Sequence, residues 1–121
     1  MKAVLVVVGI LLPFSVVNAA DNKWPTDLIC ASGVHAYFYL KEPPRQIGKL
    51  DGWTAFRSKS GATYDCQVRG RSIALKWKND SGPMSSESTQ FDERGANLTV
   101  RPKGLSEWRF QRTTNGYRSL D

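Results

Sequence analysis

The chain contains a single histidine, His35, which limits the acid–base chemistry that its side chains could perform near neutral pH. Such catalysis usually depends on histidine or on two carboxylates whose pKa values differ. A small basic secreted ribonuclease would combine His35 with a carboxylate and with Arg69 or Arg109, but the spacing of these residues does not favour such a site. We therefore expect no catalytic residues and a protein that is not an enzyme. The expected place of His35 is a half-exposed position on a strand.

The chain has two cysteines, Cys30 and Cys66, which we expect to form a structural disulfide. An even number of cysteines in an exported protein is typical of disulfide pairing, and no Cys-x-x-Cys motif is present. Oxidised cysteines and one histidine cannot build a structural zinc site. The acidic pair Asp92-Glu93 lacks the spacing of a calcium loop, and the glycines are spaced as turn residues rather than as a phosphate-binding loop. We expect neither a metal nor a cofactor.

Basic residues outnumber acidic ones, 17 to 11, which gives the chain a formal net charge of +6. Many of them fall at outward positions of the expected strands, near Tyr37 and Tyr39. Aromatic and basic residues interleaved on a sheet can bind single-stranded nucleic acid or acidic glycans. The alternative is that they keep the sheet soluble and its edges unpaired, and we expect this role for most of them. The candidate binding residues are Ser60, Tyr64, Lys76, Lys78 and Arg109.

Residues 1–19 have the layout of a cleavable secretory signal peptide. Lys2 supplies the basic first region, an apolar run extends from Ala3 to Val17, and small residues follow in Val17-Asn18-Ala19. The run is shorter than the roughly 20 residues that span a bilayer, which disfavours an uncleaved anchor. We expect cleavage after Ala19, with Ala20 as the second choice. The mature protein would then be secreted or periplasmic, with no membrane anchor.

Several short segments after the signal alternate apolar and polar residues with a period of two, as antiparallel strands do. The expected strands are Val34–Leu40, Trp53–Arg57, Tyr64–Arg69, Ile73–Lys78, Leu98–Val100 and a last one containing Trp108 and Phe110. Gly70 would turn the third strand into the fourth as a hairpin. Residues after Arg112 resemble a frayed polar tail, and Asp21–Ile29 could be a short helix or an arm.

The regular spacing of these strands predicts an all-β fold, because no segment after the signal has apolar residues at helical spacing over three turns. We expect a small antiparallel β-sandwich or barrel of about six to eight short strands, stapled by one disulfide. Residues 20–121 would form a single exported β domain with a polar C-terminal tail.

Two short motifs have counterparts in a known family. Cys30-Ala31-Ser32-Gly33 precedes an aromatic segment, and Ser60-Gly61-Ala62-Thr63-Tyr64 precedes a strand that holds Trp77-Lys78. In these stretches the chain resembles the periplasmic inhibitors of c-type lysozyme, which are small exported β-barrels. The resemblance implies that Ser60 and Lys78 would enter the lysozyme active cleft. The family has Trp-x-Lys-Gly where this chain has Trp77-Lys78-Asn79-Asp80, and a one-residue slip turns a strand side chain to the opposite face.

These features together predict an exported, non-enzymatic, small β domain that binds an unknown protein or an acidic glycan outside the cytoplasm; we do not expect nucleic acid as its partner. One alternative is a periplasmic inhibitor or immunity protein against a lysozyme-like cell-wall hydrolase. A second is the small basic secreted ribonuclease. The sequence leaves open whether the destination is a bacterial periplasm or the extracellular space, and whether Asn79 or Asn97 is glycosylated.

Overall fold

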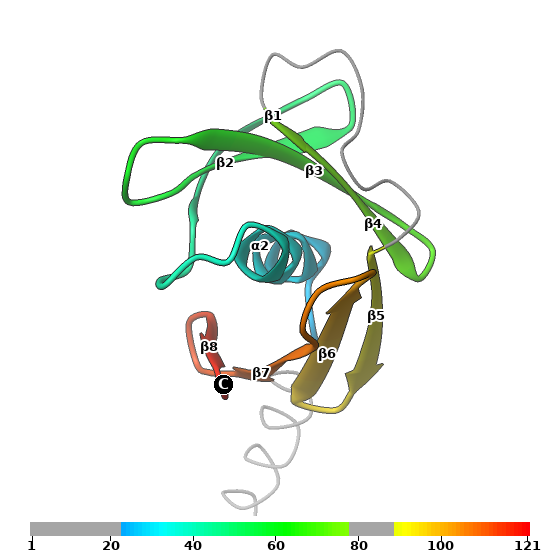
Figure 1. Cartoon of the computed structure of the whole chain (residues 1–121). Helices are drawn as coiled ribbons and strands as arrows, with labels where there is room; N and C mark the ends of the chain where they lie inside the picture. Colours follow the sequence, from blue (N-terminus) through cyan, green and yellow to red (C-terminus); the bar gives the residue numbers. More distant parts are fainter. Residues whose placement is uncertain (1–22, 78–88) are drawn as a thin grey trace, which may run out of the picture.

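A computed structural model describes residues 23–77 and 89–121 of the chain (Figure 1). The described part contains one helix, α2 (Thr26–Tyr37), followed by eight strands. In chain order the strands are β1 (Arg45–Leu50), β2 (Trp53–Arg57), β3 (Thr63–Arg69), β4 (Ser72–Trp77), β5 (Thr89–Arg94), β6 (Asn97–Pro102), β7 (Trp108–Arg112) and β8 (Tyr117–Ser119). The signal-peptide prediction and Lys78 fall outside the described residues.

The eight strands form one antiparallel sheet in which each strand pairs with its neighbours in the sequence, from β1 to β8. The sheet curls into a half-barrel around α2 (Figure 1). The pairing is thinnest between β4 and β5, where Ser72 is in register with Gln90 and the Phe91 N–H donates to the Arg71 carbonyl at 3.1 Å. This narrow junction lets the β1–β4 half and the β5–β8 half turn toward each other and enclose the helix. The expectation of an all-β domain of about six to eight antiparallel strands is confirmed.

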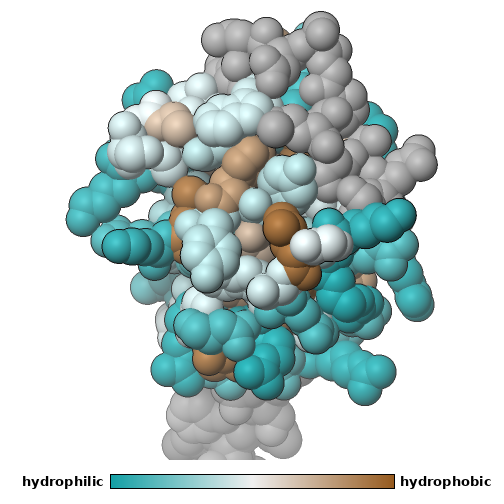
Figure 2. Space-filling view, in the orientation of Figure 1, coloured by the Kyte–Doolittle hydropathy of each residue, from teal (hydrophilic) through white to brown (hydrophobic). Residues whose placement is uncertain are grey.

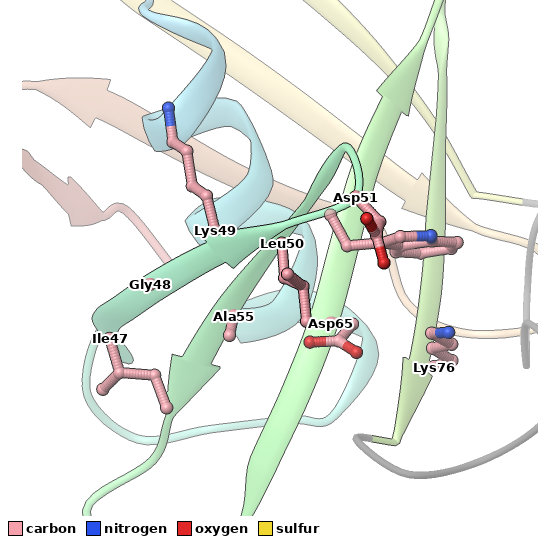
Figure 3. A pocket seen from close by; sticks show the side chains of 9 residues that line it. Ile47, Gly48, Lys49, Leu50, Asp51, Ala55, Asp65 and Lys76 are labelled. Atoms are coloured by element: carbon pink, nitrogen blue, oxygen red, sulfur yellow. The ribbon is translucent and has the colours of Figure 1, made fainter.

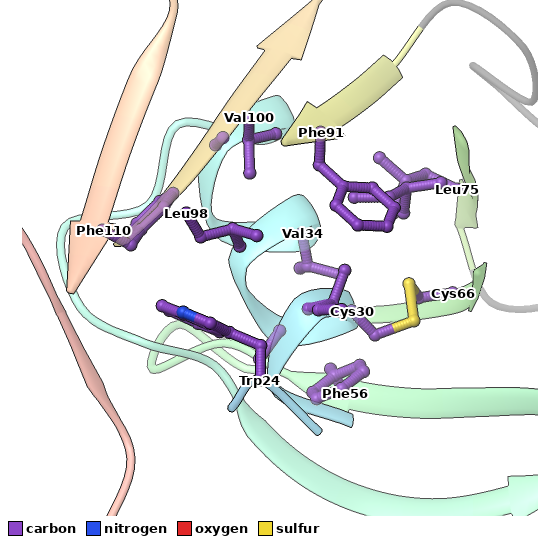
Figure 4. Packing of buried hydrophobic residues seen from close by; sticks show 14 of the residues in the cluster. Trp24, Cys30, Val34, Phe56, Cys66, Leu75, Phe91, Leu98, Val100 and Phe110 are labelled. Carbon is purple, nitrogen blue, oxygen red and sulfur yellow. A yellow bond between two sulfur atoms is a disulfide. The ribbon is translucent and has the colours of Figure 1, made fainter. Parts of the chain in front are cut away.

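The core lies between α2 and the concave face of the sheet (Figure 4). Strand positions that alternate along the sequence supply the sheet side of this core, so that Leu98 and Val100 of β6 and Phe110 of β7 are buried. The helix supplies the other side, with every residue from Ile29 to Ala36 buried. The helix approaches the sheet closely at Gly33, because a Cβ there would lie 2.9 Å from two side-chain carbons of Ile73.

The expected first strand, Val34–Leu40, is wrong: residues 34–37 are the last turn of α2, and Phe38 to Leu40 form the turn after it. Apolar residues at every second position of this segment gave it the period of two that is typical of a strand. A helix that is packed on nearly all sides has no polar face, so the 3.6-residue pattern that identifies a surface helix is missing. The undecided segment Asp21–Ile29 holds the beginning of the same helix, from Thr26 onward.

The predicted disulfide is confirmed and joins α2 to β3 through Cys30 and Cys66, whose Cα atoms are 5.8 Å apart (Figure 4). Both cysteines are fully buried within the core. The bond therefore ties the central helix to the sheet in a domain whose core is small.

The predicted polar tail after Arg112 is also wrong, because β8 pairs with β7 and continues the sheet. Arg112 organises this end of the chain. Its guanidinium donates to the carbonyls of Lys23 at 3.0 Å, Thr113 at 2.8 Å and Gly116 at 2.6 Å. These hydrogen bonds hold the 113–116 turn in place. The polar composition of the turn does not predict them.

Other predicted strands agree with the structure, including β2, the β3–β4 hairpin around Gly70, β6 and β7. Strands β1, β5 and β8 had not been expected. Within the residues that the structure describes, no helix combines the length and the apolar character that a membrane span requires.

Candidate functional site

The C-terminal end of α2 closes with a turn that places Tyr39 in the left-handed region of the backbone, at φ 56°. The Leu40 N–H donates to the His35 carbonyl at 2.9 Å and the Tyr39 N–H donates to the Ala36 carbonyl at 3.3 Å, which is the hydrogen-bond pattern of a Schellman motif. Glycine usually takes the left-handed position of this motif, since a side chain there costs roughly 1–2 kcal/mol. A tyrosine at this position therefore carries a conformational cost that a glycine would not.

Tyr39 does not use its ring to fill the core, because 77% of the residue is exposed. The ring instead meets Trp108 of β7 edge to face, with centroids 5.5 Å apart and an interplanar angle of 88°. Trp108 is half-buried and its other neighbours are His35 and Phe110. Two large aromatic rings at right angles thus form a corner at the surface.

Two adjoining hollows flank this corner and share Tyr39, Leu40 and Lys41. The first hollow, of about 480 Å³, is otherwise lined by His35, Ser106, Glu107, Trp108, Ser119 and Asp121. The second, of about 410 Å³, is otherwise lined by Glu42, Ser58, Lys59 and Ser60. We call the two together the end groove. Figure 2 shows hydrophobic residues in brown in the middle of the face over α2, between polar residues in teal.

The floor of the first hollow contains His35, which is only 2% exposed. Its Nδ1 lies 3.1 Å from the Tyr117 hydroxyl, and its ring packs against Trp108, Phe110 and Tyr117. Burial among these rings lowers the pKa of His35 below its ordinary value, and a backbone contact with Leu40 opposes this effect in part. Burial likewise raises the pKa of Tyr117. Near neutral pH the pair is therefore uncharged, as a buried hydrogen-bonded pair should be.

Each carboxylate that lines the end groove has a basic partner. Glu42 pairs with Lys59 at 3.2 Å, Glu107 lies 3.8 Å from Arg101, and Asp121 pairs with Arg109 at 3.0 Å. The backbone N–H of Arg109 also donates to Asp121 at 2.6 Å, and these bonds lower the pKa of that carboxyl.

Lys41 differs from the other charged groups of the end groove. It is exposed, and no ion pair joins it to any carboxylate of residues 23–77 or 89–121. Arg101 is shared between Glu107 and Asp92, to which it is closer at 2.7 Å. The groove, lined by two lysines and three carboxylates, therefore has mixed charge.

A separate hollow of about 510 Å³ lies on the outer face of β1–β4, away from the helix (Figure 3). We call it the outer hollow. Trp53 lines it, with the Lys76 ammonium 4.4 Å and the Arg69 guanidinium 5.6 Å from the indole centroid. Both cations therefore already have an interaction partner within the protein, the Trp53 ring. Asp51 and Asp65 line the same hollow, so its charge is mixed.

The structure separates the residues that the sequence had grouped as candidates. Ser60 lies in the end groove, where its hydroxyl is 2.9 Å from that of Ser58. Lys76 lies in the outer hollow, and Arg109 touches the end groove only through Asp121. Tyr64 is 4% exposed and its ring packs at an angle against Phe38 and Trp77, so it is a core residue.

Tyr39, Lys41 and Trp108 were not among the predicted binding residues. Their backbones come from the end of α2 and from β7, and only the folded chain brings them together. The available signal was the run Tyr37-Phe38-Tyr39 directly before two prolines. A helix that stops ahead of prolines can carry aromatic residues into an exposed turn.

Among residues 23–77 and 89–121, no group of three or more histidine, cysteine, aspartate or glutamate side chains is arranged to hold a metal ion. The sequence matches no protein-family model, and no curated protein and no solved structure matches it either. The candidate site is therefore inferred from the residues and geometry of this chain alone.

Proposed function

We propose that this protein is an exported, non-enzymatic binding module whose ligand lies in the end groove. The observation that carries the proposal is Tyr39, an exposed aromatic residue held in a left-handed conformation beside Trp108. Backbone strain and exposed aromatic surface both lower the stability of a folded protein, and both are found most often at functional sites. Pockets that combine aromatic rings with a few polar groups are the usual form of a ligand site.

The chemistry of the groove favours binding over catalysis. A general base must reach its substrate, whereas His35 is almost fully buried and bonded to Tyr117. We therefore do not carry the ribonuclease alternative further.

Export is part of the proposal and is supported by the Cys30–Cys66 bond, since structural disulfides persist in oxidising compartments. The full chain should be produced in a bacterium with its own leader, and the protein recovered from the periplasm or the medium. N-terminal sequencing is expected to begin at Ala20. Recovery only from the cytoplasm, with residues 1–19 intact, would contradict export.

Ligand binding can be tested by titrating the purified protein with a panel of soluble oligosaccharides, peptides and oligonucleotides while its tryptophan fluorescence is recorded. We expect at least one member to bind the wild type, and Tyr39→Gly and Trp108→Ala to weaken that binding more than tenfold. Leu50→Ala is the matched control, because Leu50 is exposed on the outer hollow. The proposal fails if no member binds, or if the binders retain their affinity for both groove variants.

Inhibition of a lysozyme-like hydrolase is a second candidate function. The observation that favours it is the position of Ser60 in the second hollow of the end groove, which Tyr39 also lines. A molar excess of the protein should then abolish lysis of bacterial cells by c-type lysozyme, and Ser60→Arg should restore lysis. Undiminished lysis at high excess would remove this candidate and leave the general binding proposal in place.

A further inference from the structure

We propose that a hollow beside the β2–β3 turn binds a doubly charged oxyanion, a phosphate or sulfate group, between the guanidinium groups of Arg45 and Arg57. The hollow has a volume of about 320 Å³ and is lined by Pro43, Arg45, Arg57, Ser58, Lys59 and Gly61. We call it the arginine hollow. It shares Ser58 and Lys59 with the end groove, but the inference goes beyond the proposed function and does not depend on it.

The register of the first two strands brings two positive charges together. Arg45 of β1 and Arg57 of β2 are directly opposite each other in the antiparallel pair. Side chains at opposite positions project from the same face of a sheet, and like charges there destabilise the pair. An anion bound between the two guanidinium groups would replace this repulsion by two attractions.

Protection of the sheet edge explains only one of the two arginines. Strand β1 is an edge strand, and a charged residue such as Arg45 can keep an edge from pairing with another chain. Strand β2 is paired on both sides, with β1 and with β3, so it has no free edge to protect. A role for Arg57 at this position must therefore come from something other than the edge.

The protein itself does not compensate the charge of the arginine hollow. No carboxylate is among the lining residues. Within the part of the chain that the structure describes, no ion pair joins Arg45 or Arg57 to an acidic group. Lys59 is paired with Glu42 at 3.2 Å and adds no net charge. The two exposed guanidinium groups therefore leave a charge of two to be matched by a ligand.

The donors of the hollow favour a tetrahedral oxyanion over a carboxylate. A guanidinium group binds phosphate or carboxylate through two parallel N–H groups, so two arginines can bind two edges of one phosphate or sulfate group. A single carboxylate has one charge and is satisfied by one guanidinium. The turn contributes little, because the N–H groups of Ser58 and Gly61 already donate to the carbonyls of Ala62 and Ser58, both at 2.9 Å.

Thermal unfolding of the purified protein tests the inference with inorganic phosphate as the probe. The midpoint is compared in 10 mM phosphate and in sodium chloride of the same low ionic strength. We expect phosphate to raise the midpoint of the wild type by about 3–5 °C, because a ligand of the folded state stabilises that state. Arg45→Gln and Arg57→Gln should each lose most of this rise. Lys103→Gln is the matched control, because Lys103 is an exposed basic residue after β6, outside the hollow.

The same experiment without phosphate provides a second readout. In chloride alone, Arg57→Gln should unfold at a higher temperature than the wild type, because the repulsion between the opposite arginines is removed. Lys103→Gln should not show this gain. The effect of Arg57→Gln on the midpoint relative to the wild type should thus change sign when phosphate is added.

Sulfate and glycerol 3-phosphate distinguish the sources of the oxyanion. Equal rises with phosphate, sulfate and the ester would identify the free anion as the ligand, and a larger rise with the ester would identify a phosphorylated organic molecule. An equal rise in the wild type and in both arginine variants would be a general salt effect and would overturn the inference, as would no rise in the wild type. The end groove is judged separately, through Tyr39 and Trp108.

Discussion

His35 and Tyr117 show how single residues set the properties of this domain. The only histidine of the chain lies in the end groove, surrounded by aromatic rings and bonded to the hydroxyl of the half-buried Tyr117. Charging His35 would place an imidazolium where few groups can solvate it, and its pKa is accordingly lowered. Protonation of His35 should therefore make the stability of the fold depend on pH.

We predict that acid weakens the fold through His35. Because its pKa is lower in the folded state, the unfolded chain binds the proton more readily, and the free energy of unfolding decreases as the pH falls below about 6.5. Urea unfolding of the wild type should show a lower midpoint at pH 5.5 than at pH 7.5. His35→Asn, whose amide can still bond to Tyr117, should lose most of this difference. An equal pH dependence in both proteins would contradict the assignment.

Tyr39 supports a second prediction, on the relation between stability and binding. Tyr39→Gly removes the contact with Trp108 but relieves the left-handed conformation, so the two effects offset each other. We expect the free energy of unfolding to change by no more than about 1 kcal/mol while ligand binding is lost. A loss of about 3 kcal/mol, typical of a truncated core side chain, would mean that Tyr39 is a packing residue.

Sequence reasoning located the residues of the core better than those of the groove. The pairing of Cys30 with Cys66 could be predicted because the chain has only two cysteines. The burial of Phe110 could be predicted from the alternation of apolar and polar residues in its strand. The end groove could not, because it combines a helix end with β7 and with the β2–β3 turn, segments far apart in the sequence. Lys76 was correctly placed on a strand, yet its ammonium faces Trp53 rather than an open basic surface.

At the scale of elements, α2 determines the architecture because the sheet curls around it. The helix contains Ala31, Ser32 and Gly33 in succession, and these small side chains let the backbone approach β4 closely. The sequence gives little sign of this arrangement, since a helix buried on all sides lacks a polar stripe. Strand β6 has one buried face and keeps a period of two, so it could be predicted. Strand β1 has no buried residue and therefore lacks this signal.

We predict that Gly33→Ala destabilises the protein, although alanine favours helix formation by about 1 kcal/mol over glycine. The added Cβ would lie 2.9 Å from Cδ1 and Cγ2 of the fully buried Ile73, so overpacking should prevail and cost about 1–3 kcal/mol. Gly48→Ala is the control, because a Cβ at that exposed position meets nothing within 4 Å. Thermal or urea unfolding compares the two variants. A neutral or stabilising Gly33→Ala would refute the close helix–sheet contact.

The disulfide supports a further prediction at this scale. Cys30 and Cys66 are 36 residues apart, and in the chain-entropy model closing a loop of that length stabilises by roughly 4 kcal/mol. The double variant Cys30→Ala/Cys66→Ala should lose stability of this order, and reduction of the wild type should have a similar effect. Unfolding in urea with and without a reductant measures both. A loss below about 1 kcal/mol would show that packing alone holds α2 on the sheet.

At the scale of the whole molecule, a half-barrel around a helix leaves the helix end uncovered. The sheet curves around the sides of α2, while the turn that follows the helix leaves through the open side of the half-barrel (Figure 1). The outer hollow on β1–β4 is the main competing location for a ligand, and it differs from the end groove by its internally satisfied cations.

Amide NMR spectra of the ¹⁵N-labelled protein, recorded during titration with a ligand that the panel identifies, test most directly which surface binds. The account predicts that the largest chemical-shift changes fall on residues of the end groove, namely Tyr39 to Lys41, Ser58 to Ser60 and Ser106 to Trp108. Changes centred on Leu50, Trp53 and Lys76 would place the ligand in the outer hollow and contradict the account, as would a spectrum that does not change at millimolar ligand.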